Sequence, residues 1–169
     1  MALIDNLIAY WKLDEASGTR VDAHGSNDLT DNNTVASAAG KLSNAADFNG
    51  AASESLSRAD NSSLAFGDAS WTVVLWARLN NIAWADRILI SKDDNGSNRG
   101  WGCWVLTART PYMEVYNGTS TGRGSKTHST VLTVETWYML AFYYDKPNTL
   151  IGISVNGAAA ETAVTTGAL

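Results

Sequence analysis

Acidic side chains are the first candidates for chemistry in this sequence of 169 residues. A retaining glycosidase needs two carboxyl groups about 5–5.5 Å apart, which on one face of a strand means acidic residues two or four positions apart. None of the five glutamates has an acidic neighbour at that spacing: Glu15, Glu54, Glu114, Glu135 and Glu161. The two histidines, His24 and His128, lack a nearby serine or cysteine in a nucleophile-like setting, and we expect both in solvated loops. The sequence therefore predicts no enzyme and no catalytic residues.

Oxygen-rich loops are candidates for calcium, which takes six to eight oxygen ligands. The polar stretch over residues 14–31 holds the candidate ligands Asp14, Asp22, Asn27 and Asp28. A second loop, residues 93–96, resembles part of a calcium loop but lacks the glutamate that completes an EF-hand. Asp and Asn also stabilise turns by bonding to their own backbone. Bound calcium and simple turns both stay open.

Aromatic side chains near predicted loops are candidates for stacking on sugar rings. The candidates are Trp84, Trp101, Tyr112 and Tyr116, with Arg99 as a nearby hydrogen-bond donor. The alternative is that the seven tryptophans mostly fill a core, as large apolar rings usually do.

The elements that must position these side chains are β-strands. Residues 137–144 are apolar on both faces and predict an interior strand. Residues 150–155 alternate so that Ile151, Ile153 and Val155 face the core, and Asn156-Gly157 predicts a type I′ turn. Further strands are predicted over residues 7–13, 45–50, 53–57, 71–79, 87–91, 101–108 and 112–116.

Strand spacing and composition favour a single all-β domain over residues 1–169. Residues 71–79 alternate most clearly and are predicted as a second interior strand, with Trp71, Val73, Leu75, Ala77 and Leu79 inward. The lone Cys103 has no partner for an internal disulfide and is expected as a small buried hydrophobe.

Charge and hydropathy exclude some partners. The net charge is −5 and the basic residues are scattered, so neither nucleic acid nor an anionic membrane surface is expected. No run approaches the ~18 apolar residues needed for membrane insertion. The first residues lack the basic region of a signal peptide, which predicts synthesis in the cytoplasm without a signal.

Several short motifs occur in an order typical of one family. They are residues 7–15 with Ser17-Gly18, then residues 46–50, 71–79, 135–138, 144–145 and 155–157. This ordered set resembles the concanavalin A-like (laminin G-like) lectin and glucanase superfamily. The resemblance implies an all-β fold, a two-sheet antiparallel jelly-roll sandwich. The Glu-x-Asp-x-x-Glu motif of its glucanase members is absent here.

The resemblance implies two functions. A short laminin G-like chain without a signal peptide is similar to bacteriophage virion surface proteins, which decorate capsids or act in tail adsorption. The alternative is a lectin-like, carbohydrate-binding module of a secreted or cell-surface bacterial protein, which would be extracellular and bind surface glycans.

The end of the sequence adds an expectation about partners. Members of the family usually continue past the last hairpin with one or two closing strands, which we expect to be missing after Leu169. The strand over residues 7–13 would then have an open edge. We expect another copy of the chain or a larger virion assembly to cover it. A fragment of a longer protein is the competing explanation.

Overall fold

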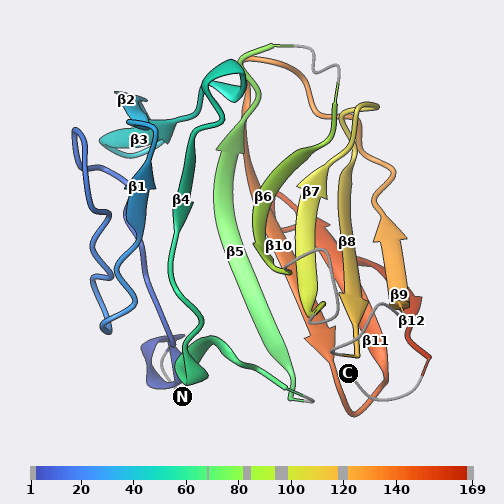
Figure 1. Ribbon diagram of the computed structural model, residues 1–169. Helices are drawn as coiled ribbons and strands as arrows, with labels where there is room; N and C mark the ends of the chain where they lie inside the picture. Colours follow the sequence, from blue (N-terminus) through green and yellow to red (C-terminus); the bar gives the residue numbers. More distant parts are fainter. Residues whose placement is uncertain (1–2, 68, 82–84, 94–98, 118–121, 167–169) are drawn as a thin grey trace. The chain divides into compact units, whose positions relative to one another are not determined.

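The computed structural model of the chain describes residues 3–67, 69–81, 85–93, 99–117 and 122–166 (Figure 1). The chain divides into two compact units, residues 1–65 (unit 1) and residues 66–169 (unit 2). Across the described ranges the regular structure is antiparallel strands with three short 3-10 helices. No helix in those ranges is long and apolar enough to cross a membrane. The expectation of a single domain over residues 1–169 stays a prediction.

Unit 1 is built from short elements joined by loops. Two small antiparallel sheets form where β1 (Thr30–Asn32) pairs with β4 (Ser55–Ser57) and where β2 (Ala36–Ala39) pairs with β3 (Asn44–Asp47). The 3-10 helices are η1 (Leu3–Asn6), η2 (Gly50–Ala52) and η3 (Ser62–Leu64). Strands β3 and β4 confirm the strands predicted near residues 45–50 and 53–57.

The strand predicted over residues 7–13 is wrong. Only Trp11 forms a bridge there, an isolated one with Asp22. The side chains still alternate between partly buried and exposed, but the neighbouring segment is an irregular loop. The Tyr10 amide therefore donates to a carboxylate oxygen of Asp22, at 2.9 Å, where a ladder would offer a carbonyl. The open sheet edge that we predicted at residues 7–13 is therefore not present, because these residues form no strand.

Unit 2 is a sandwich of two four-stranded antiparallel sheets (Figure 1). One sheet has the order β12-β11-β10-β5 and the other β6-β7-β8-β9. The strands are β5 (Trp71–Arg78), β6 (Arg87–Lys92), β7 (Trp101–Val105), β8 (Pro111–Tyr116), β9 (Gly122–Thr127), β10 (Trp137–Asp145), β11 (Leu150–Val155) and β12 (Glu161–Val164). The predicted all-β, two-sheet antiparallel sandwich is confirmed.

The position of β5 corrects one detail of that prediction. β10 is an interior strand, as predicted, whereas β5 ends its sheet. Its inward residues do pack on the core, and the outward Val74 and Trp76 are 59% and 44% exposed. Alternating apolar and polar residues show only that one face of a strand is buried. An edge strand also has one buried face, so the pattern does not distinguish it from an interior strand.

The core of unit 2 lies between the two sheets. Its fully buried apolar side chains come from both layers, including Cys103 and Met113 on one side and Phe142 and Ile153 on the other. The predicted inward face of residues 150–155 and the burial of Cys103 are confirmed. Burying such residues contributes about 1.5–3 kcal/mol per large side chain before entropy is counted.

The hairpin turn after β11 has the predicted chemistry. Asn156 and Gly157 have φ angles of 54° and 75°, and a type I′ turn requires positive values at both central residues. The Ala158 amide donates to the Val155 carbonyl at 3.1 Å and closes the turn. The Asn156 side chain also accepts the Met139 amide at 3.0 Å, which ties the turn to β10.

Candidate functional site

The outer face of the β6-β7-β8-β9 sheet, the face turned away from the core, carries the candidate site. Alternation along β8 sends Met113 and Val115 into the core and Tyr112 and Glu114 to the outer face. On β7, Cys103 and Val105 face the core, so Trp104 lies on the outer face. Antiparallel pairing places Trp104 directly opposite Tyr112.

The two rings form an aromatic platform. The centroids of Trp104 and Tyr112 are 5.6 Å apart with an interplanar angle of 51°. The indole of Trp104 lies over Gly102, where an added Cβ atom would stand 2.1 Å from Cη2 of the tryptophan. Gly102 therefore gives the ring its place against the sheet.

Charged side chains beside the platform form a connected network. The guanidinium of Arg99 donates to Asp93 from Nη2 at 2.7 Å and from Nε at 3.0 Å, and Nη2 lies 3.3 Å from Oε1 of Glu114. The Tyr112 hydroxyl donates to the other oxygen of Glu114. The guanidinium of Arg99 also lies over the ring of Tyr116, with Cζ of the arginine 3.7 Å from the ring centroid. This network fixes the Glu114 carboxylate.

Two titrating groups respond to this environment. The hydrogen bond to Asp93 raises the pKa of Arg99 above its usual range, against the cost of burial. Burial, followed by the hydrogen bond to Glu114, raises the pKa of Tyr112 to about 12. The phenol therefore keeps its proton and remains a donor to Glu114 at physiological pH.

Two hollows open on this face, one on each side of Glu114. The first has a volume of about 370 Å³ and is lined by Asp86, Trp104, Leu106, Tyr112 and Glu114. The second has a volume of about 300 Å³ and is lined by Glu114, Tyr116, Gly122, Arg123, Gly124 and Ser125. We call the set of Asp86, Asp93, Arg99, Trp104, Tyr112 and Glu114 the outer-face site.

The two-sheet antiparallel sandwich agrees with the comparison with known families. The family model described as the concanavalin A-like lectin/glucanases superfamily matches residues 49–169. The chain belongs to this superfamily. No curated protein and no solved structure matches the chain.

The predicted sugar-binding residues of this superfamily member have different placements. Tyr112 and Arg99 lie in the outer-face site. Trp84 falls outside the described residues. The expected exposure of Trp101 is wrong: its ring is 8% exposed and stacks on Phe66 in the core, with centroids 5.5 Å apart. Tyr116 is also 8% exposed, because Arg99 covers it.

Four residues of the site were not predicted to bind sugar: Asp86, Asp93, Trp104 and Glu114. Asp93 was considered only as the start of the second candidate calcium loop, whose residues 94–96 lie outside the described ranges. Strict alternation along residues 101–105 would have set Trp104 on the face opposite Trp101. Asp93 and Glu114 meet at one arginine although 21 positions separate them, and no spacing along a strand signals such a pair. Glu114, treated as isolated in the sequence, therefore shares a cation with a second carboxylate.

The predicted calcium ligand Asp22 acts instead as an acceptor for backbone amides in unit 1. Its oxygens accept hydrogen bonds from the amides of Tyr10 at 2.9 Å, His24 at 3.0 Å and Asn27 at 3.0 Å. Burial opposes ionisation, but these donors and the Gly25 amide hold the pKa of Asp22 well below its usual range.

The other predicted calcium ligands also take part in hydrogen bonds within unit 1. Asp28 accepts the Asp22 amide at 2.8 Å, and the Asn27 side chain accepts the Ser63 hydroxyl at 2.9 Å. The Asp14 carbonyl accepts from the side chain of Asn44 at 3.5 Å. In the ranges that the structure describes, no three acidic, histidine or cysteine side chains gather as a metal site. Calcium binding by these residues stays a prediction.

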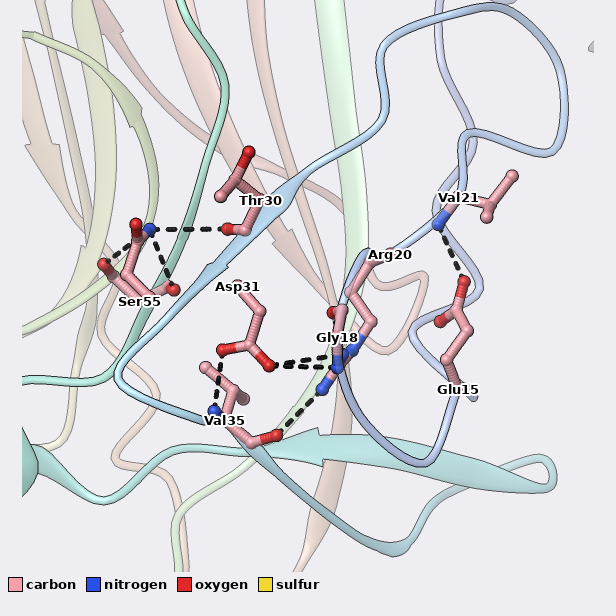
Figure 2. A network of polar contacts seen from close by, with 9 residues as sticks. Glu15, Gly18, Arg20, Val21, Thr30, Asp31, Val35 and Ser55 are labelled. Carbon is pink, nitrogen blue, oxygen red and sulfur yellow. Dashed lines mark hydrogen bonds and ion pairs between the residues drawn. The ribbon is translucent and has the colours of Figure 1, made fainter.

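A buried arginine organises the neighbouring loops of unit 1 (Figure 2). Arg20 is 0% exposed and donates to the carbonyls of Gly18 and Val35, the latter at 3.0 Å. It also lies 3.7 Å from a carboxylate oxygen of Asp31, which accepts the Val35 amide through its other oxygen. These contacts satisfy loop backbone groups where a ladder is absent.

His128 corrects the expectation of two solvated histidines. It is 6% exposed, and its Nδ1 accepts the Thr130 amide at 3.1 Å. Glu161 lies 3.7 Å from the same nitrogen and accepts the Ser129 hydroxyl. His24 is exposed, as predicted.

Proposed function

We propose that unit 2 is a carbohydrate-binding module and that the outer-face site holds the sugar. The observation that carries this proposal is the partly exposed Trp104–Tyr112 pair, which lines a hollow together with two carboxylates. Sugars present C–H faces that stack on aromatic rings and hydroxyl groups that donate to carboxylates. The hollow of about 370 Å³ lies within the range usual for small-ligand sites.

Preorganisation supports the same function. Arg99 and the Tyr112 hydroxyl hold the two oxygens of Glu114, so this carboxylate loses little freedom when a ligand arrives. A carboxylate has about four acceptor positions. Two protein donors therefore leave Glu114 room for ligand hydroxyl groups.

The same network argues for binding over hydrolysis. The superfamily includes glucanases as well as lectins, and Asp93 with Glu114 is a carboxylate pair bridged by one arginine on this face. A retaining glycosidase places the scissile bond between its two carboxyl groups. Here Nη2 of Arg99 lies between them, 2.7 Å from Asp93 and 3.3 Å from Glu114. We therefore propose a module without catalytic activity.

The biological setting stays a prediction. A bacteriophage virion surface and a bacterial cell surface are both compatible with a glycan-binding module. No contact in the described ranges favours either setting, and assembly with further copies of the chain is likewise a prediction.

A glycan array followed by calorimetry tests the proposed function. The wild-type chain is expected to bind at least one glycan, and Trp104→Ala should weaken that binding about tenfold, from the lost stacking. The matched control is Trp76→Ala, which removes a tryptophan that is 44% exposed on the other sheet. Equal loss in both variants would contradict a site at Trp104.

A further inference from the structure

The charged side chains that line the larger hollow of the outer-face site are all acidic. Its lining residues comprise two carboxylates, Asp86 and Glu114, two aromatic rings and one leucine, with no basic side chain among them. Asp86 is exposed, and its Oδ1 accepts the Thr107 amide at 2.8 Å, which orients the carboxylate. The basic Arg123 lines the second hollow, on the far side of Glu114.

The wider network leaves this charge only partly compensated. Arg99 is shared by Asp93 and Glu114, and the shorter contact, 2.7 Å against 3.3 Å, goes to Asp93. One guanidinium therefore serves two carboxylates, and Asp86 adds a third negative charge at the rim of the hollow. The local potential attracts cations and repels anions.

Covering these carboxylates has a cost that depends on the ligand. A neutral ligand over Glu114 removes water from the carboxylate, whose side chain is 20% exposed, without returning charge. An ammonium group offsets that cost through the carboxylates and also gains from the face of a tryptophan ring. An anionic sugar meets repulsion in addition to the desolvation cost.

We propose that the ligand of the outer-face site is a cationic glycan, one whose sugar units carry free amino groups. This inference rests on the proposed carbohydrate-binding function and specifies the sugar class. The ammonium group lies between Asp86 and Glu114, and the C–H face of the same sugar or of its neighbour stacks on Trp104 and Tyr112. Such placement satisfies the charge and the apolar surface of the hollow together.

A lysine-rich peptide carries the same ammonium chemistry, but the platform favours a sugar. The two rings, with centroids 5.6 Å apart and planes inclined by 51°, offer two adjoining apolar faces, more than a single alkyl stem covers. A pyranose ring matches the area of an aromatic face.

The test compares three probes by calorimetry at low salt and mildly acidic pH: a glucosamine trisaccharide, its fully N-acetylated counterpart and trilysine. We expect the glucosamine trisaccharide to bind at least about tenfold more tightly than the acetylated one, and raised salt to narrow the difference. Asp86→Asn should weaken binding of the amino sugar about fivefold and leave the acetylated probe unchanged. Glu114→Gln should likewise reduce the preference for the glucosamine trisaccharide over its acetylated counterpart.

The control variant is Asp5→Asn, which removes an exposed carboxylate from unit 1. It should bind all three probes as the wild type does, and circular dichroism should show the same sheet content in every variant.

The outcomes separate this inference from the proposed function. Equal or tighter binding of the acetylated probe, still lost in Trp104→Ala, would overturn the cationic preference and leave carbohydrate binding intact. Trilysine binding as tightly as the amino sugar would overturn the assignment to a glycan. Absence of binding to these sugars and to every glycan on the array would overturn the proposed function, and the inference with it.

Discussion

Asp22 shows how one carboxylate can replace regular structure. It is 4% exposed and accepts backbone amides from both sides of an irregular loop. Hydrogen bonds from amides to an ionised carboxylate are among the stronger polar contacts in proteins. The ionised carboxylate of Asp22 therefore stabilises the loops of unit 1 through hydrogen bonds, and the stability of these loops should depend on pH.

Replacing Asp22 by asparagine should destabilise the loops of unit 1 by about 2 kcal/mol at neutral pH. The amide NH2 of asparagine would face backbone donors where the carboxylate accepts them. Because the pKa of Asp22 is lowered in the folded chain, its contribution is complete above about pH 4 and is lost as the pH falls below that value. Amide exchange at Tyr10, His24 and Asn27 measures the effect.

Asp14→Asn is the matched control for this prediction, since it neutralises another acid of the same polar segment. The gap in exchange protection between wild type and Asp22→Asn should narrow on acidification. A gap that is unchanged between neutral pH and pH values below about 4 would contradict a role for the ionised carboxylate.

Individual residues of the site were predicted only in part, and the reason is geometric. The sequence offered seven tryptophans, and loop proximity was a poor guide to which are exposed. Trp101 and Trp104 both lie in β7, and opposite parity sends one to the core and the other to the outer face. Long-range partners such as Asp93 and Glu114 depend on the fold and leave no local pattern.

Strand β7 also shows how a glycine can place an aromatic ring. Trp104 lies over Gly102 in this strand, and on the other sheet Tyr143 of β10 lies over Gly152 of β11 in the same way. An added Cβ would stand 2.1 Å from the indole at Gly102 and 2.3 Å from the phenol at Gly152. In both cases the ring must move to admit a methyl group.

Gly102→Ala should therefore displace the Trp104 indole and weaken glycan binding about tenfold, as Trp104→Ala does. The matched control is Gly152→Ala, which displaces Tyr143 on the other sheet and should leave binding unchanged. Calorimetry with the best glycan from the array measures both variants. Binding lost in Gly152→Ala and kept in Gly102→Ala would reverse the assignment of the face.

Strands were predicted well wherever one face is apolar, and poorly elsewhere. β5, β10 and β11 have clear alternation and were found near their predicted bounds. β9, Gly122–Thr127, has no apolar residue and was missed, because its partner β8 supplies the ladder. Residues 7–13 alternate but lack a regular neighbour, so they form no sheet.

The two units differ in how they are stabilised. The hydrophobic core cluster lies entirely within unit 2, from Trp71 to Val155, and draws on both sheets. In unit 1, Val35 is the buried apolar side chain among the described residues, beside the polar Arg20, Asp22 and Asn27. Apolar burial dominates the stability of one unit, and hydrogen bonding dominates the other.

A fragment of residues 66–169 should therefore fold alone, with a β-type far-UV spectrum and a cooperative thermal transition. A fragment of residues 1–65 should melt without cooperativity, since it buries little apolar surface. Circular dichroism of both fragments checks this. A non-cooperative melt of the larger fragment would show that its core is insufficient without the preceding residues.

The burial of Cys103 makes its chemical reactivity a measure of how often strand β7 opens. It is the one cysteine of the sequence and is 0% exposed, and burial raises the pKa of its thiol. The thiol lies on the core side of β7, while Trp104 on the same strand lies on the outer face. A thiol reagent can reach Cys103 only when the sheet opens. The rate at which the reagent labels Cys103 therefore reports how often β7 opens. A bound sugar should reduce this labelling rate by the factor 1 + [L]/Kd.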